Sequence, residues 1–188
     1  MTGEINADAP WVNEVLGFWF EDLSRAAWYE RDAATDDAIR ARFGPLTERL
    51  SVAPPEIEGA SARTVLAAVI VLDQFPRNMF RDSPKAFACD GTALALVEAA
   101  IARGQDRELT VPQRHCLYLP LQHCENPAIQ ARAVALYGEL GEAEGLDYAR
   151  RHKAIIDRFG RFPHRNAALA RASTPEESAF LKEPGSLF

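Results

Sequence analysis

The chain of 188 residues has few of the residues on which small secreted or metal-binding proteins depend, with only 3 cysteines and 4 histidines. An odd number of cysteines argues against a disulfide framework and favours reduced thiols. The sequence has no run of about 20 uninterrupted apolar residues, so it predicts no membrane span. The N-terminal segment Met1–Asn6 lacks the basic and apolar regions of a secretory signal. We therefore expect a cytoplasmic protein with no membrane partner.

Strand signals and the common active-site motifs are also missing. No segment of four or more residues alternates between apolar and polar side chains, bounded by turn signals, as a strand would. The sequence contains no glycine-rich phosphate loop, no Gly-x-Ser-x-Gly elbow and no His-Glu-x-x-His helix. The sequence therefore predicts neither a sheet nor a cofactor.

Helical signals, in contrast, extend from one end of the chain to the other. The apolar residues Ile39, Phe43, Leu46 and Leu50 recur at helical spacing. Three further helix starts combine a capping residue with a proline, at Ser83-Pro84, Asn126-Pro127 and Thr174-Pro175. Short connections make successive helices antiparallel neighbours. We predict one all-α domain over residues 1–188, built from stacked antiparallel helical hairpins.

Charge is distributed unevenly along a chain whose net charge is −6. Residues 1–62 carry 12 acids and 5 bases, whereas residues 150–171 carry 7 bases and a single acid, Asp157. Nucleic-acid binding requires a broad positive surface, so we expect no nucleic-acid partner. The basic segment has two interpretations: its arginines form surface ion pairs with acids elsewhere, or they hold one small anion.

Two segments repeat one arrangement of polar residues. In each, an apolar helix carries an aspartate near its end, meets Phe-Pro, and is followed by arginine and asparagine. The polar residues are Asp73, Arg77 and Asn78 in the first segment, and Asp157, Arg161, Arg165 and Asn166 in the second. Because a proline disfavours helix at the residue before it, we expect both helices to stop there and Arg77 and Arg165 to lie on loops.

These repeated residues support two hypotheses. In the functional one, stacked hairpins bring both segments to one cleft, where guanidinium groups bind an anionic ligand. In the structural one, Asp73 and Asp157 pair with Arg77 and Arg161, because buried carboxylates need such partners. The sequence leaves both open.

Three residues near these segments are candidates for catalysis: His123, Glu125 and His164. A histidine beside a carboxylate can act as a general base near neutral pH. His152 lies in a run of basic residues, so we expect it on a solvated helix face. The adjacent pair His123-Cys124 does not predict a metal site, because neighbouring residues on a helix point about 100° apart.

Four segments together resemble one known family. They are Val15–Phe20 (VLGFWF), Leu72–Asn78 (LDQFPRN), Tyr118–Pro120 with His123 and Glu125, and Arg158–Asn166 (RFGRFPHRN). Over nearly its whole length, the chain resembles the bacterial family known as domain of unknown function 924. The resemblance implies a helical fold similar to that of tetratricopeptide-repeat proteins, and it brings no activity with it. The family usually has His-Ser-Glu where this chain has His123-Cys124-Glu125, so no hydroxyl is available at position 124.

We expect a bacterial protein whose cleft of Asp, Arg, Asn and His side chains binds a small anionic ligand. Two alternatives remain open. One is a tetratricopeptide-like scaffold that binds a peptide, and the other is a hydrolase that uses His123 and Glu125. The sequence indicates neither the ligand nor the oligomeric state.

Overall fold

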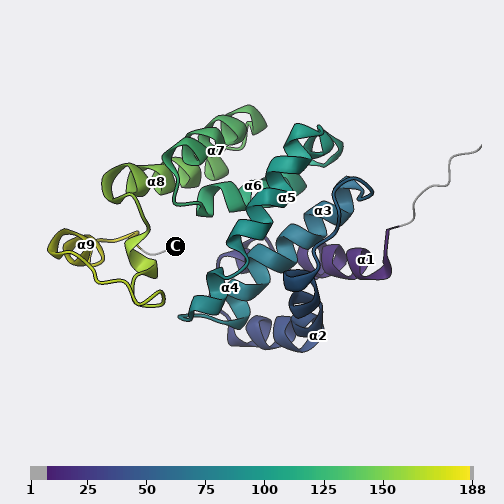
Figure 1. Ribbon diagram of the computed structural model, residues 1–188, viewed down its shortest axis with the longest axis horizontal. Coiled ribbons are helices and arrows are strands. Elements are labelled where there is room, and N and C mark those ends of the chain that lie inside the picture. The colour runs from purple at the N-terminus through teal and green to yellow at the C-terminus, as the bar shows by residue number, and fades with distance from the viewer. Residues whose placement is uncertain (1–7, 187–188) are drawn as a thin grey trace, which may run out of the picture.

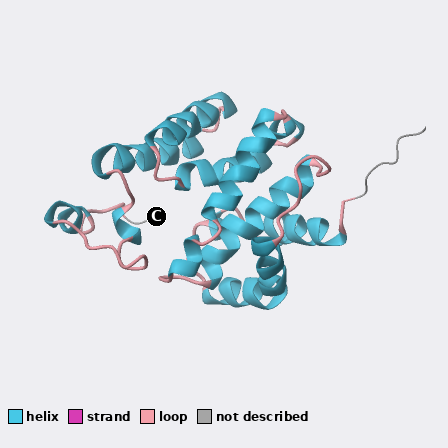
Figure 2. Ribbon diagram, in the orientation of Figure 1, coloured by secondary structure: helices cyan, strands magenta, loops and turns pink. Residues whose placement is uncertain are grey.

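The computed structural model describes residues 8–186. Within that range the chain is helical, with no strand (Figure 2), so the all-α prediction is confirmed. Residues 1–7 and 187–188 lie outside the described range, and with them the segment Met1–Asn6 considered above as a targeting signal. Among the residues described, no helix has both the length and the apolar character needed to cross a bilayer.

Figure 1 labels the α-helices in chain order. They are α1 (Pro10–Gly17), α2 (Ala33–Val52), α3 (Ala62–Val69), α4 (Phe75–Met79), α5 (Asp90–Ala102), α6 (Val111–His123), α7 (Pro127–Leu140), α8 (Ala143–Phe159) and α9 (Pro175–Phe180). Two π-helical turns, η1 (Phe18–Asp22) and η3 (Ile70–Gln74), follow α1 and α3 directly. Four 3-10 turns complete the described helices: η2 (Ala26–Trp28), η4 (Pro84–Phe87), η5 (Gln105–Glu108) and η6 (Pro163–Arg165).

Capping chemistry sets the boundaries of these helices, as the sequence predicts. The Ser83 hydroxyl accepts from the Lys85 amide at the start of η4, and the Asn126 side chain accepts from two amides of α7. Thr174 forms a capping box with Glu177 at the start of α9. Gly141 and Gly160 end α7 and α8 with φ of 73° and 69°, a left-handed conformation that favours glycine.

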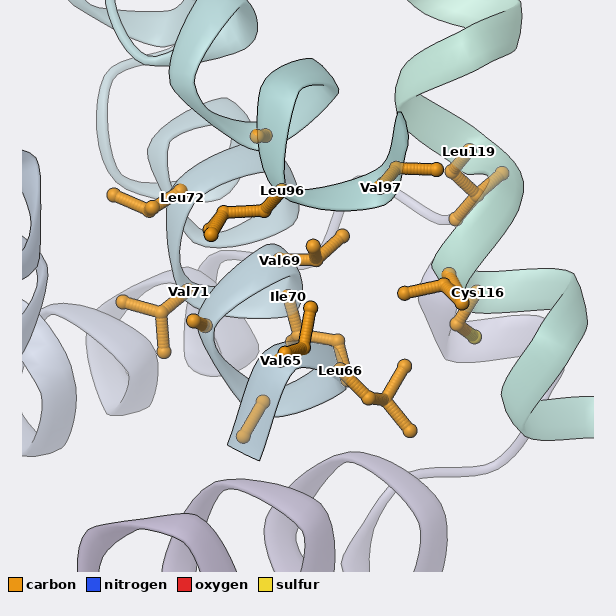
Figure 3. Packing of buried hydrophobic residues seen from close by; sticks show 14 of the residues in the cluster. Val65, Leu66, Val69, Ile70, Val71, Leu72, Leu96, Val97, Cys116 and Leu119 are labelled. Carbon is orange, nitrogen blue, oxygen red and sulfur yellow. The ribbon is translucent and has the colours of Figure 1, made fainter. Parts of the chain in front are cut away.

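The core is built around α3 and the π turn that extends it. Every residue from Val65 to Leu72 is at most 1% exposed, so this helix is apolar on all sides. A helix of that kind must be enclosed by others, and α1, α5 and α6 pack around it. Figure 3 shows Leu96 of α5 and Cys116 of α6 beside the α3 side chains.

The C-terminal third lies on the opposite side of the molecule from α1 (Figure 1). Gly141 and Glu142 are the only residues between α7 and α8, so these two helices are antiparallel neighbours, and α7 also packs on α6. After α8, a separate small apolar cluster forms around Ile155, Ile156 and Phe162.

The helix that contains Asp73 does not stop at Phe75, so that prediction is wrong. In η3 the Phe75 amide bonds to the Ile70 carbonyl, five residues back, and α4 then continues through Pro76 to Met79. In an α-helix the proline ring clashes with the carbonyl four residues earlier. The wider π turn makes room for that ring. Arg77 therefore lies on a helix rather than on a loop.

Candidate functional site

Five elements from four separate parts of the sequence bring charged side chains together beside the core. Asp73 and Arg77 come from η3 and α4, Asp90 opens α5, His123 ends α6, and Arg165 ends η6. Hydrogen bonds or ion pairs connect all five side chains. We call these five residues the polar cluster.

Two arginines of the polar cluster share the carboxylate of Asp90. Arg77 donates to both carboxylate oxygens at 2.9 and 3.0 Å, and Arg165 donates to one of them at 3.2 Å. The position of Asp90 in the first turn of α5 favours its negative charge. Arg77 also donates to the main-chain carbonyl of Asp73 at 2.6 Å, which fixes it across the π turn.

Arg165 is buried but has few hydrogen-bond partners. Its side chain is 7% exposed, and its guanidinium carbon lies 4.7 and 4.6 Å from the ring centres of Phe87 and Phe162. Within the described part of the chain, its side chain donates one hydrogen bond, to Asp90, and its buried Nε meets no acceptor. Burial and the nearby Arg77 charge lower the pKa of Arg165 to about 10. Arg165 is thus a cation whose charge is only partly compensated.

Asp73 and His123 form a buried pair. Asp73 is fully buried, and one of its oxygens lies 2.9 Å from His123 Nδ1 and 3.2 Å from Arg77. Gln74 donates to its other oxygen at 2.6 Å. Burial alone would raise the pKa of Asp73, but the Arg77 charge and these hydrogen bonds lower it below the ordinary range. Asp73 is therefore a carboxylate that holds the imidazole of His123 in place.

Glu125 holds the segment that carries Arg165. The Phe162 amide donates to Glu125 at 2.7 Å, and Arg171 donates to both of its oxygens at 2.7 and 3.0 Å. Arg171 also donates to the Phe162 carbonyl at 3.1 Å, so Glu125, Arg171 and the Phe162 main chain are bonded to one another. Burial would raise the pKa of Glu125, but the bonds from Arg171 and Phe162 lower it. Glu125 is thus an occupied carboxylate that positions the loop.

A pocket of about 190 Å³ lies beside the polar cluster. It is lined by Asp90, Gly91, Leu94, Pro120, His123, Cys124, Glu125 and Arg165. Burial raises the pKa of the Cys124 thiol, which disfavours a reactive thiolate there. A second concavity, of about 270 Å³, lies at the start of α3, where Asp8 and Glu56 are the charged residues that line it. The first pocket is the one with a cation in its wall.

Two more histidines surround the polar cluster, and His152 is not on a solvated face as predicted. It is 6% exposed, its Nδ1 donates to the Tyr148 carbonyl at 2.8 Å, and its ring centre is 6.1 Å from that of His123. Burial and the proximity of His123 lower the pKa of His152 to about 3. Burial and Arg165 lower the pKa of His164 to about 3 as well. Both histidines are therefore neutral at neutral pH.

Besides Glu125 and His164, four predicted site residues of the two repeated segments lie outside the polar cluster. Asn78 donates to Asp36, while Arg161 and Asn166 both donate to Glu177. Asp157 is exposed on α8 and pairs with Lys153 at 2.5 Å. The expectation that every polar residue of both segments faces one cleft is corrected for these four. For Asp157 the reason is the insertion Gly160-Arg161-Phe162, which separates the helix face of Asp157 from Pro163-His164-Arg165-Asn166. Asn78 lies on α4 and bonds to Asp36 of α2 instead.

Sequence reasoning missed two residues of this region. Asp90 stands in the first turn of a helix, where an acid is common for electrostatic reasons alone. Arg171 is one of the bases of the segment 150–171, and no residue near it in the sequence indicates an ion-pair partner. For His152 a signal existed: with Ile155, Ile156 and Phe159 it follows the three- and four-residue spacing of a buried helix face.

Comparisons with known proteins place the chain in a family. The model of the family described as "Bacterial protein of unknown function (DUF924)" matches residues 15–185. A solved structure of a protein of unknown function from Agrobacterium tumefaciens, ATU0120, is 37% identical, with a TM-score of 0.83, and the match covers 91% of this chain and 96% of that one. No curated protein matches the chain. The chain belongs to the bacterial DUF924 family.

Proposed function

We propose that the pocket beside the polar cluster binds a small oxyanion, a carboxylate or a phosphate, with Arg165 as its principal contact. The observation that carries this proposal is the buried guanidinium of Arg165, whose hydrogen bonding within the described chain is limited to Asp90. A guanidinium has five N–H donors, and buried donors without acceptors are costly in free energy. An oxyanion in the pocket would accept hydrogen bonds from Arg165 and would raise the pKa of Arg165 toward the ordinary value of an arginine.

The wall of the pocket suits a small anion in other respects. Asp90 would repel an anion if it were alone, but Arg77 already holds both of its oxygens. Leu94 and Pro120 supply an apolar side against which a short carbon chain can pack. The volume is below the ~300–1,000 Å³ of sites for drug-sized ligands, which limits the ligand to a few non-hydrogen atoms.

One second candidate function has an observation in its favour. The pair of Asp73 and His123 has the geometry of a general base oriented by a carboxylate. In a hydrolase of this kind His123 would be the base, while Glu125 would position the loop, because its oxygens are held by Arg171 and Phe162. The peptide-binding, tetratricopeptide-like alternative has less support, because a pocket of about 190 Å³ is small for a peptide.

Titration calorimetry of the full chain with inorganic phosphate and with acetate tests the proposal. The variant Arg165→Met keeps an unbranched side chain that can pack against Phe87 and Phe162 but removes its charge and its donors. Arg103→Met is the matched control, because Arg103 is exposed and pairs only at 3.4 Å with an exposed glutamate, Glu58. We expect the wild-type chain and Arg103→Met to bind at least one of the two anions with equal affinity.

For Arg165→Met we expect an affinity lower by about tenfold or more, since a charge-assisted hydrogen bond contributes roughly 1.5–3 kcal/mol. Far-ultraviolet circular dichroism of the variant should match the wild type. If neither anion binds the wild-type chain, or if Arg165→Met binds as the wild type does, the proposed function is wrong.

A further inference from the structure

The two ring nitrogens of His123 have different surroundings: one bonds to a buried carboxylate, and the other can bind a ligand. Nδ1 lies 2.9 Å from Asp73, which also interacts with Gln74 and Arg77. Because an ionised carboxylate only accepts hydrogen bonds, Nδ1 must carry the hydrogen. In a neutral imidazole the lone pair then resides on Nε2. Nε2 forms no hydrogen bond with the described residues, and His123 lines the pocket.

The groups that face His123 keep its ring neutral. Burial lowers the pKa of His123, and the Arg77 and Arg165 charges lower it further, against the opposing effect of Asp73. His152 and His164, which interact electrostatically with His123, are themselves neutral near pH 7. The pocket therefore offers a donor and an acceptor together: the guanidinium of Arg165 and Nε2 of His123.

Building on the anion site proposed above, we propose that the ligand is a short 2-hydroxycarboxylate, whose carboxylate binds Arg165 while its hydroxyl donates to Nε2 of His123. The positive charge available in the pocket wall is that of Arg165, because Arg77 is bound to Asp73 and Asp90. That single charge matches a monoanion better than a phosphate dianion. An anion without a donor, such as acetate, leaves the His123 acceptor unfilled.

Glycolate, acetate and methoxyacetate distinguish this ligand class on the wild-type chain by calorimetry at pH 7.5. Glycolate adds a hydroxyl to acetate, and methoxyacetate keeps that oxygen but lacks its hydrogen. We expect glycolate to bind about tenfold more tightly than acetate, the effect of one good hydrogen bond. Methoxyacetate should bind no more tightly than acetate.

Two variants test the role of His123 itself. In His123→Asn the amide nitrogen can still donate to Asp73, but nothing replaces Nε2, so glycolate and acetate should bind equally. In His123→Gln the amide oxygen can reach the position of Nε2, so part of the glycolate preference should return. Because the comparison on the wild-type chain needs no substitution, a variant that fails to fold leaves the proposal testable.

Two outcomes overturn the hydroxycarboxylate while leaving the anion site intact. The first is equal affinity of the wild-type chain for glycolate and acetate. The second is uptake of one proton when acetate binds, which titrations in buffers of different ionisation enthalpy measure. That proton would make His123 a hydrogen-bond donor, so Nε2 could not accept from a hydroxyl. If phosphate, acetate and glycolate all fail to bind, the proposed function falls together with this ligand class.

Discussion

Arg165 donates to Asp90 at 3.2 Å although 75 positions separate the two residues in the sequence. This hydrogen bond joins the segment after α8 to the first turn of α5. Arg77 binds both oxygens of the same carboxylate, so Asp90 is the group at which the two sequence-related segments meet. The consequences of altering Asp90 follow from that position.

Asp90→Asn should lower stability and strengthen anion binding. The substitution leaves the buried Arg165 and the partly buried Arg77 without their shared counter-charge, and breaking a buried ion pair costs about 3–5 kcal/mol. It also removes the negative charge in the pocket wall, so the affinity for acetate or phosphate should rise. Urea unfolding and calorimetry measure the two effects.

Asp82→Asn is the control for Asp90, because Asp82 and its partner Arg31 are 79% and 67% exposed. An exposed pair contributes about 1 kcal/mol or less, so this variant should behave nearly as the wild type. Equal loss of stability in both variants would contradict the central position assigned to Asp90.

Acid should destabilise the protein from about pH 6.5 downward. His152 and His164 have pKa values of about 3 when folded, against about 6.5 for an unperturbed histidine. The unfolded chain therefore binds protons that the folded chain excludes, and stability is lost as the pH falls from 6.5 toward 3. Each such histidine contributes a slope approaching about 1.4 kcal/mol per pH unit.

His152→Asn isolates one of these contributions. The asparagine amide can still donate to the Tyr148 carbonyl, but it does not titrate. Urea unfolding between pH 6 and 4.5 should then show a pH slope smaller by about 1.4 kcal/mol per unit than that of the wild type. An unchanged slope would mean that His152 takes up a proton in the folded state.

Gly145→Ala should destabilise the packing of α8 against α7 and α6. A Cβ atom at Gly145 would lie 2.7 Å from a ring carbon of Tyr137 and 2.9 Å from His115 Nδ1. Overpacking of this kind costs about 1–3 kcal/mol. Gly138→Ala is the matched control, because a Cβ there has open space on α7, and it should stabilise the helix by about 0.5–1 kcal/mol. Thermal unfolding should shift in opposite directions for the two variants.

The basic segment over residues 150–171 should not bind nucleic acid. Three of its arginines are engaged, with Arg158 bonded to Glu176, Arg161 to Glu177, and Arg171 to Glu125. The net charge of −6 also repels phosphates. Fluorescence anisotropy with a random DNA duplex at physiological ionic strength should show no micromolar complex. A micromolar, salt-sensitive complex would contradict this expectation.

The helices could be predicted from sequence because their signals are local. A capping residue such as Asn126 and a C-terminal glycine such as Gly141 act within one helical turn, so neighbouring residues suffice to recognise them. The π turn could not be predicted, because Pro76 by itself indicates a helix end. Only the surrounding core, which buries Ile70 to Gln74, makes continuation of the helix favourable.

The candidate site was predictable only in part, for a related reason. The repeated sequence segments predicted that Asp73 and Arg77 lie near Arg165, and in the structure Asp90 links them. The partner that joins them, Asp90, carries no motif and depends on long-range packing. Asp157 shows the converse. Its place in the repeated motif suggested that it binds the ligand, but the insertion before Pro163 separates it from Arg165, and it pairs with Lys153 on the surface of α8.

The division of the apolar core has a consequence for the order in which the protein is assembled during synthesis. The main core draws its buried residues from Val12 to Ala149, whereas Ile155, Ile156 and Phe162 form a cluster of their own. A nascent chain that has left the ribosome only as far as α7 already contains most of the main core, and N-terminal parts generally fold first. Arg165 emerges later, so the pocket wall is completed after the scaffold. A chain that ends after α7 would contain most of the main core but would lack Arg165 and the pocket wall that it forms.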